Sequence, residues 1–241
     1  MAEHSSVLIT GAAGEIGRAA AELLASRGCS LVLVDHDAEA VSALAARLRG
    51  ATAVAADMLD ARRVAAVFDD AAPRLGAVVL AVGTEGPIGP LETCDDAAFA
   101  RSMTVNVTSA WLGLKHALRV LKPKGAGSIV ALSSISGVMA SPMMGAYAAG
   151  KHAVMGLVRT AAREAAGTGV RVNAVCPGPA DSEMMRRIDT RLGRPDAAQS
   201  VPMKRYAAPA EIAETIAFLC SDASRYSTGG AFMVDGGYSC R

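Results

Sequence analysis

The sequence has few aromatic residues, almost no net charge and no long apolar run. Phe, Trp and Tyr make up 4% of its 241 residues, which argues against a surface that stacks on nucleic-acid bases. Lys and Arg number 24 against 23 Asp and Glu, and the net charge of +1 provides no general attraction to nucleic acid or to anionic lipid. No stretch approaches the ~20 apolar residues of a membrane span. We therefore expect neither a nucleic-acid partner nor a membrane partner.

The cysteines form no pattern typical of a disulfide framework or a zinc site. The five of them are scattered, and no CxxC pair or Cys/His cluster with zinc-ligand spacing occurs. We expect reduced thiols and no bound metal. The N-terminus lacks a basic start, and the apolar run at 7–9 is too short for a signal peptide. These features predict a cytoplasmic protein.

Short β-branched apolar runs alternate with Ala-rich helical stretches along the chain. The predicted strands cover residues 7–10, 30–34, 52–56, 77–82, 128–132, 170–175 and 231–234. The predicted helices cover residues 15–26, 38–49, 61–72, 96–121, 147–166 and 209–220. Strands that are apolar at every position are buried on both faces, as in a parallel sheet covered by helices. We predict a single α/β domain over residues 1–241, with a Rossmann-like, doubly wound sheet of about seven parallel strands and helices on both faces.

A glycine-rich segment, TGAAGEIG at 10–17, connects the first predicted strand to the first predicted helix. Its glycines, Gly11, Gly14 and Gly17, allow a tight turn, close approach of a pyrophosphate and contact between helix and strand. The helix N-terminus then offers free N–H groups to the phosphates. A purely structural turn would have a similar sequence, but the position after the first strand favours a dinucleotide site.

An acidic residue follows at the end of the second predicted strand. Asp35 stands 18 residues after Gly17, where a carboxylate can accept hydrogen bonds from both ribose hydroxyls. The same carboxylate would repel a 2′-phosphate, and no Arg is adjacent to receive one, so the sequence favours NAD over NADP. The alternative is that Asp35 only caps the next helix. Asp57, after the third predicted strand, suits the adenine edge, although helix capping fits its spacing as well.

With these residues in place, the chain resembles the short-chain dehydrogenase/reductase family over essentially its whole length. The motifs that carry the resemblance are the glycine turn, Asp57, Asn106, Ser134, the Tyr147-x-x-x-Lys151 pair, Asn173, Pro177-Gly178 and Asp235-Gly236-Gly237. A YxxxK string alone is common by chance, but Ser134 stands thirteen residues before Tyr147 and the later motifs follow in the family's order. The resemblance implies an NAD(P)-dependent oxidoreductase that acts on carbonyl and secondary alcohol groups.

The residues Ser134, Tyr147 and Lys151 suit that chemistry. Tyr147 and Lys151 are four residues apart and share one helix face. A nearby ammonium is expected to lower the pKa of the phenol, so that Tyr147 exchanges a proton with the substrate oxygen. The Ser134 hydroxyl would stabilise charge on that oxygen, and Lys151 would also bind the nicotinamide ribose. By resemblance, Asn106 holds a water molecule that connects Lys151 to solvent.

The resemblance also implies a set of cofactor contacts and a substrate lid. The cofactor contacts are Gly11, Gly14, Glu15, Ile16, Gly17, Asp35, Asp57, Met58, Ala81, Gly83, Tyr147, Lys151, Pro177, Gly178 and Ser182. The lid would cover residues 179–200, and most compact members of the family form homotetramers.

Two segments depart from the family's pattern. The compact branch has a glycine where this chain has Glu15, and we expect the Glu15 side chain to face solvent because it would otherwise repel a pyrophosphate. The family's Asn-Asn-Ala-Gly is replaced by LAVG at 80–83, which removes two amide side chains near the adenine ribose. These departures keep open a second hypothesis, a dinucleotide-binding sensor or scaffold without catalytic activity.

Methionines dominate the segments that would face the substrate. They are Met139, Met143, Met144, Met184 and Met185, and their flexible thioethers suit a small to medium, mainly apolar ketone or secondary alcohol. Packing at the base of the lid or in a subunit contact would explain them equally well. The lid also contains Arg186, Arg187, Arg191 and Arg194, which attract an anionic substrate or form a solvated helix face. An NADP-preferring reductase is the remaining alternative.

Overall fold

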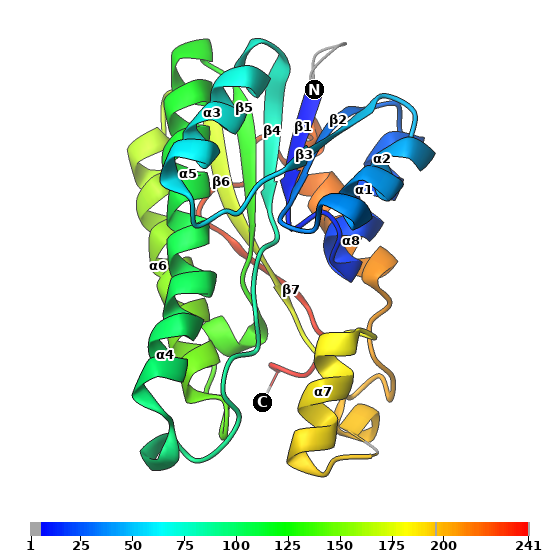
Figure 1. The fold of residues 1–241 in the computed structure, drawn as a ribbon, viewed down its shortest axis with the longest axis vertical. Helices are drawn as coiled ribbons and strands as arrows, with labels where there is room; N and C mark the ends of the chain where they lie inside the picture. Colours follow the sequence, from blue (N-terminus) through cyan, green and yellow to red (C-terminus); the bar gives the residue numbers. More distant parts are fainter. Residues whose placement is uncertain (1–5, 196, 241) are drawn as a thin grey trace.

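The computed structural model describes residues 6–195 and 197–240, and its centre is a parallel sheet. Seven strands pair in the order β3-β2-β1-β4-β5-β6-β7, with every pairing parallel (Figure 1). The strands are β1 Ser6–Thr10, β2 Ser30–Asp35, β3 Ala51–Ala55, β4 Leu75–Leu80, β5 Gly127–Leu132, β6 Val170–Pro177 and β7 Ala231–Val234. The prediction of a doubly wound, seven-stranded parallel sheet is confirmed.

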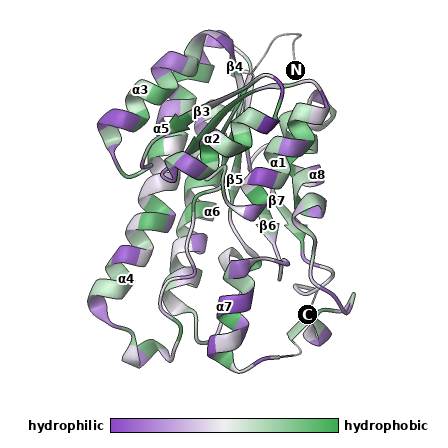
Figure 2. Ribbon diagram, turned by 45° about the vertical axis from the view of Figure 1, so that its right-hand side comes forward, coloured by the Kyte–Doolittle hydropathy of each residue, from purple (hydrophilic) through white to green (hydrophobic). Residues whose placement is uncertain are grey.

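Helices cover both faces of the sheet. One face carries α1 Glu15–Ser26, α2 Ala38–Arg47 and α8 Pro209–Cys220, and the other carries α3 Ala61–Ala71, α5 Ser109–Leu121 and α6 Gly145–Ala165 (Figure 1). The alternation within β1 shows why the strands are apolar throughout. Val7 and Ile9 pack into the core under α1 and α8, whereas Leu8 packs into the core under α3 and α5. Figure 2 shows the hydrophilic residues gathered on the outer sides of several of these helices.

Two further helices lie beyond the carboxyl ends of the strands. They are α4 Asp96–Met103, which packs on α6, and α7 Glu183–Leu192, which follows β6 (Figure 1). The chain reverses its winding between β1 and β4, which are neighbours in the sheet. Ligands of open α/β sheets bind at the carboxyl ends of the strands beside such a switch point. The region between the glycine turn, the end of β4 and α7 is therefore the candidate ligand site.

The long helix predicted over 96–121 is divided in the structure. A π-helical turn at Thr104–Thr108 separates α4 from α5. It holds Asn106, whose side chain is fully buried and bonded to the backbone of Ser102 and Thr84. A π turn is a short feature inside an otherwise helical segment, so a pattern that predicts a helix over 96–121 does not reveal it. Within the described chain, no helix combines the length and the apolar character needed to cross a bilayer.

Candidate functional site

The glycine turn between β1 and α1 is built by two glycines that the protein itself requires. Gly11 has a φ of +67°, and a Cβ there would lie 2.8 Å from the carbonyl carbon of Ala81. A Cβ on Gly17 would lie 2.1 Å from the Gly11 oxygen. Gly14 is exposed, and its nearest neighbour would be 3.5 Å away. Gly14 is also the N-cap of α1 and provides no side-chain cap, so the first turn of the helix is open to an anion.

Asp35 lies at the end of β2 beside this turn, with a side chain that is nearly buried. Its Oδ2 accepts a hydrogen bond from the Ala13 N–H at 2.9 Å, and its Oδ1 accepts one from the Asp37 N–H at 3.1 Å. His36 Nδ1 lies 2.9 Å from the same Oδ1. The N-cap of α2 is Asp37, whose side chain accepts from Ala40 N–H. Asp35 is therefore not a helix cap, which removes the alternative role that its spacing left open.

Asp57 and Met58 follow β3 in the next turn along the chain. The Asp57 Oδ1 accepts a hydrogen bond from the Leu59 N–H at 2.9 Å, which is a local turn contact. The cap of α3 is Asp60, and Met58 is buried in the core. A contact of Asp57 with an adenine edge stays a prediction.

Ser134, Tyr147 and Lys151 line one wall of a cavity of about 450 Å³. Ser134 follows β5, and its hydroxyl accepts the Ser136 N–H at 3.1 Å. Tyr147 and Lys151 project from α6, and Lys151 Nζ lies 5.6 Å from the centre of the Tyr147 ring. Lys151 is buried and donates to the Leu132 carbonyl at 3.0 Å. The structure thus brings together the three side chains that the sequence analysis selected for proton transfer.

The pKa values of this group differ from the expectation drawn from spacing. Burial raises the pKa of the Tyr147 phenol, although the Ser134 hydroxyl acts in the opposite direction. Burial also lowers the pKa of Lys151 to about 8. The expected lowering of the Tyr147 pKa by the ammonium is therefore wrong for this structure. The reason is geometric, because Lys151 Nζ is directed at the Leu132 carbonyl and does not offset the loss of solvent around the phenol.

Asn106 fixes the loop that leaves β4. Its Oδ1 accepts the Thr84 N–H at 3.1 Å, and its Nδ2 donates to the Thr84 carbonyl at 2.9 Å. Gly83 lies close beside it, and a Cβ there would be 3.0 Å from Asn106 Oδ1 and 3.2 Å from Lys151 Nζ, so an alanine would require these side chains to shift by a few tenths of an ångström. The amide of Asn106 thus holds the backbone of the loop that follows β4. The water-binding role that the resemblance implies stays a prediction.

The rest of the cavity wall is mainly apolar. Ile16, Ala81 and Gly83 line the side of the glycine turn, whereas Pro177, Gly178 and Ser182 line the side of β6. The lid segment and the loop after β5 contribute the apolar side chains Met139, Met144, Met184, Met185, Ile188 and Leu192. Ser182 is also the N-cap of α7 and accepts the Met185 N–H at 3.1 Å. The cavity therefore joins the glycine turn to Ser134, Tyr147 and Lys151 beneath the apolar side of the amphipathic lid helix α7.

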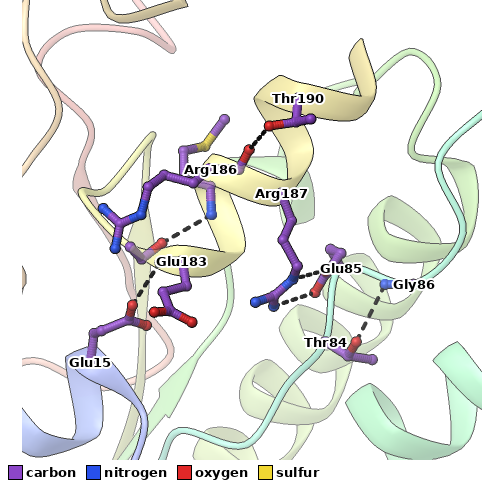
Figure 3. A network of polar contacts seen from close by, with 10 residues as sticks. Glu15, Thr84, Glu85, Gly86, Glu183, Arg186, Arg187 and Thr190 are labelled. Carbon is purple, nitrogen blue, oxygen red and sulfur yellow. Dashed lines mark hydrogen bonds and ion pairs between the residues drawn. The ribbon is translucent and has the colours of Figure 1, made fainter. Parts of the chain in front are cut away.

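Two carboxylates hold α7 over this cavity. Glu15 Oε1 accepts the N–H of Glu183, the first residue of α7, at 2.6 Å (Figure 3). Glu85 accepts two hydrogen bonds from Arg187, at 2.7 Å from Nε and 3.2 Å from Nη2. Burial raises the pKa of Glu85, but the bonds and charge of Arg187 outweigh it and hold the pKa below its usual value. The expectation that Glu15 faces solvent is wrong, because its half-buried carboxylate caps the lid helix instead.

The four lid arginines have different surroundings. Arg186 pairs with Asp181 at 2.8 Å and Arg187 pairs with Glu85, while Arg194 lines the cavity. The sequence analysis grouped them as one charged run, and nothing in their spacing distinguishes Arg194. Among residues 6–195 and 197–240, no group of three or more His, Cys, Asp or Glu side chains is arranged to hold a metal ion.

Comparisons with known proteins agree with this architecture. A family profile described as enoyl-(acyl carrier protein) reductase matches residues 11–239. The chain is 40% identical over 239 residues to cis-4-hydroxycyclohexanecarboxylate dehydrogenase of Sinomonas cyclohexanicum, which covers 96% of this chain and 95% of that protein. The crystal structure of NAD+-bound xylitol dehydrogenase superposes with a TM-score of 0.92 at 31% identity, covering 98% of this chain and 99% of that one. The structure of ElxO with NADP bound superposes with a TM-score of 0.92 at 26% identity, covering 99% and 100%.

Proposed function

The chain belongs to the short-chain dehydrogenase/reductase family, and we propose that it oxidises an alicyclic secondary alcohol, or reduces the corresponding ketone, with NAD(H). The observation that carries this proposal is the cavity wall at which Ser134, Tyr147 and Lys151 meet. The same cavity reaches Ile16 and Gly83 beside the glycine turn, so a dinucleotide bound there would extend to the catalytic group. The apolar lining and the 40%-identical relative both support a ring-shaped carbon frame.

The residues present fit a dinucleotide. The open first turn of α1 at Gly14 would hold the pyrophosphate, and Asp35 would accept the ribose hydroxyls. Lys151 would bind the nicotinamide ribose. Two backbone N–H groups fix the Asp35 carboxylate, so it cannot turn away from a 2′-phosphate without losing both bonds. This supports NAD rather than NADP.

The proton and the hydride then move along separate routes. A bound nicotinamide supplies the hydride acceptor for alcohol oxidation and the donor for ketone reduction. Ser134 donates a hydrogen bond to the substrate oxygen, and Tyr147 accepts the alcohol proton or returns it to the carbonyl. Lys151, positively charged when protonated, favours the phenolate that accepts the alcohol proton in oxidation and that forms when Tyr147 gives its proton to the carbonyl in reduction. These two roles require the hydroxyls of Tyr147 and Ser134 to lie close together, and both side chains line the same cavity.

A cofactor titration followed by a substrate panel tests the proposal. NADH and NADPH are titrated separately against the protein, with energy transfer from Trp111, the only tryptophan, as the signal. We expect NADH to bind at least tenfold more tightly than NADPH. Turnover of cyclohexanols with NAD+ is then followed by nicotinamide absorbance, with Tyr147→Phe as the inactive control. Binding of neither cofactor would favour the non-catalytic hypothesis, and tighter binding of NADPH would favour the NADP-preferring reductase.

A further inference from the structure

The cavity has a positive charge that the proposed proton transfer does not use. Of the residues that line it, only Lys151 and Arg194 carry a full charge, and no aspartate or glutamate of the described chain is among them. Lys151 is committed to the catalytic group through its bond with the Leu132 carbonyl. Arg194 follows the end of α7, is exposed, and lines the cavity among side chains that, apart from Lys151, are apolar or neutral.

Arg194 also differs from the other arginines of the lid in its lack of a counter-ion. Arg186 and Arg187 pair with Asp181 and Glu85, and Figure 3 shows Arg187 directed at Glu85. Arg191 does not line the cavity. No carboxylate in the described ranges, 6–195 and 197–240, forms an ion pair with Arg194, which leaves its guanidinium free to pair with a ligand.

The backbone of Arg194 is anchored to the lid helix, so the side chain has a defined origin. Gly193 ends α7 in the left-handed conformation, with a φ of +62°, and the Arg194 N–H donates to the Asp189 carbonyl at 2.9 Å. The Asp189 side chain is held by the Tyr206 hydroxyl at 2.5 Å. The Asp189 carboxylate is therefore bonded to a neutral hydroxyl and forms no ion pair with Arg194 among the described residues.

We propose that Arg194 selects substrates that carry an anionic group, a carboxylate above all, on the carbon frame away from the carbinol carbon. A planar guanidinium binds a carboxylate through two parallel hydrogen bonds, and the exposed Arg194 can offer these donors to a ligand in the cavity that it lines. A cavity of about 450 Å³ accommodates a six-membered ring with one such substituent. The inference rests on the proposed function, because it places the reacting oxygen at Tyr147.

The test compares a carboxylate substrate with its neutral carboxamide. The pair is cis-4-hydroxycyclohexanecarboxylate and cis-4-hydroxycyclohexanecarboxamide, assayed with wild type, Arg194→Gln and the control Arg191→Gln. We expect Arg194→Gln to lower kcat/KM for the carboxylate about 10- to 100-fold and to change that for the carboxamide less than twofold, since a charge-assisted bidentate pair is lost. Arg191→Gln should leave the ratio of the two substrates unchanged. An equal loss on both substrates, or no preference in wild type, overturns the inference.

A binding measurement separates this inference from the proposed function. Cyclohexanecarboxylate and cyclohexanecarboxamide are titrated by calorimetry into wild type and Arg194→Gln, with a melting curve to establish that the variant is folded. Tighter binding of the carboxylate, lost in Arg194→Gln, supports the anion site even if no alcohol is turned over, in which case only the proposed reaction fails. Equal binding of both ligands, or no binding of either, overturns the anion site whatever the activity.

Discussion

The lid helix α7 should open more readily when the two carboxylates that hold it are removed. Glu15 belongs to α1 and Glu85 to the loop after β4, so both tie the lid to the cofactor side of the cavity (Figure 3). Their partners, the Glu183 N–H and Arg187, are four residues apart on α7. We predict that Glu15→Ala and Glu85→Gln each accelerate opening of the lid and that the double variant has the largest effect.

The magnitude follows from the exposure of each contact. The Glu85 side chain is 12% exposed, but Arg187 is 52% exposed, so solvent screens the pair and it contributes about 1 kcal/mol to the closed lid. A carboxylate that caps a helix N-terminus contributes about 1 kcal/mol as well. Each single variant should therefore open the lid about fivefold more often. The double variant, taken as additive, should open it about 30-fold more often, since 1.4 kcal/mol is a factor of ten.

Amide hydrogen exchange of the cofactor-free protein measures this opening. Peptides that cover 183–192 should exchange faster in the variants, while peptides from β1 and β4 in the core should not change. Arg186→Gln is the matched control, because its partner Asp181 belongs to the same lid segment and does not tie α7 to the body of the protein. If α7 exchanged as slowly in the double variant as in wild type, Glu15 and Glu85 would not hold the lid closed. The same would follow if Arg186→Gln accelerated the exchange of α7 as much as the double variant does.

Four further outcomes follow from the site and the core. Tyr147→Phe should lower turnover about 10²- to 10⁴-fold with almost unchanged NADH affinity, and a variant with wild-type rates would contradict its role in proton transfer. Asp35→Ser should reduce the preference for NADH over NADPH about tenfold in the fluorescence titration, because it removes a carboxylate that repels a 2′-phosphate; an unchanged ratio would exclude Asp35 as the determinant. Gly83→Ala should lower turnover about tenfold because its Cβ would come close to Lys151 Nζ. Full activity of this variant would show that the loop after β4 shifts to accommodate the Cβ. Burial lowers the pKa of His116, so the unfolded chain binds the proton more readily than the folded one, and the free energy of unfolding should fall as the pH drops below about 6.5. Urea unfolding at several pH values should show a smaller fall in His116→Leu than in wild type. An equal fall in both proteins would show that His116 does not cause the pH dependence.

The parallel sheet could be predicted because its signal is local. Each strand is a short apolar run, and most of these runs are followed by a helix that the sequence predicts. The exceptions are β6, whose following helix α7 was not predicted, and β7, which is the last element. Strand β1 is an example, since Val7, Leu8 and Ile9 are all buried, on one face of the sheet or the other. The π turn at Thr104–Thr108 could not be predicted in the same way, because its cause is the bond from Asn106 to Thr84, a residue on another element.

The contacts of the lid were beyond prediction for a similar reason. Glu15 and Glu183 are 168 residues apart, and no periodicity connects them. The four lid arginines look alike in sequence, and only the structure distinguishes the paired Arg187 from Arg194 at the cavity wall. The residues of the catalytic group were selected correctly as neighbours, whereas the direction of the Tyr147 pKa depended on burial that spacing does not report.

The departure at Glu15 has a physical explanation in this geometry. A carboxylate in the first turn of α1 is stabilised by that helix's N-terminal partial charge, and here the same carboxylate also accepts the first N–H of α7. The Glu15 carboxylate is therefore stabilised by the N-termini of both α1 and α7. This stabilisation offsets the electrostatic repulsion between the carboxylate and an anion bound beside it. Its oxygen is directed at the lid, while Gly14, one residue earlier, stays exposed and uncapped. The phosphate-binding edge and the lid contact thus use different N–H groups, and loss of the Glu15 side chain should loosen the lid without closing the cofactor turn.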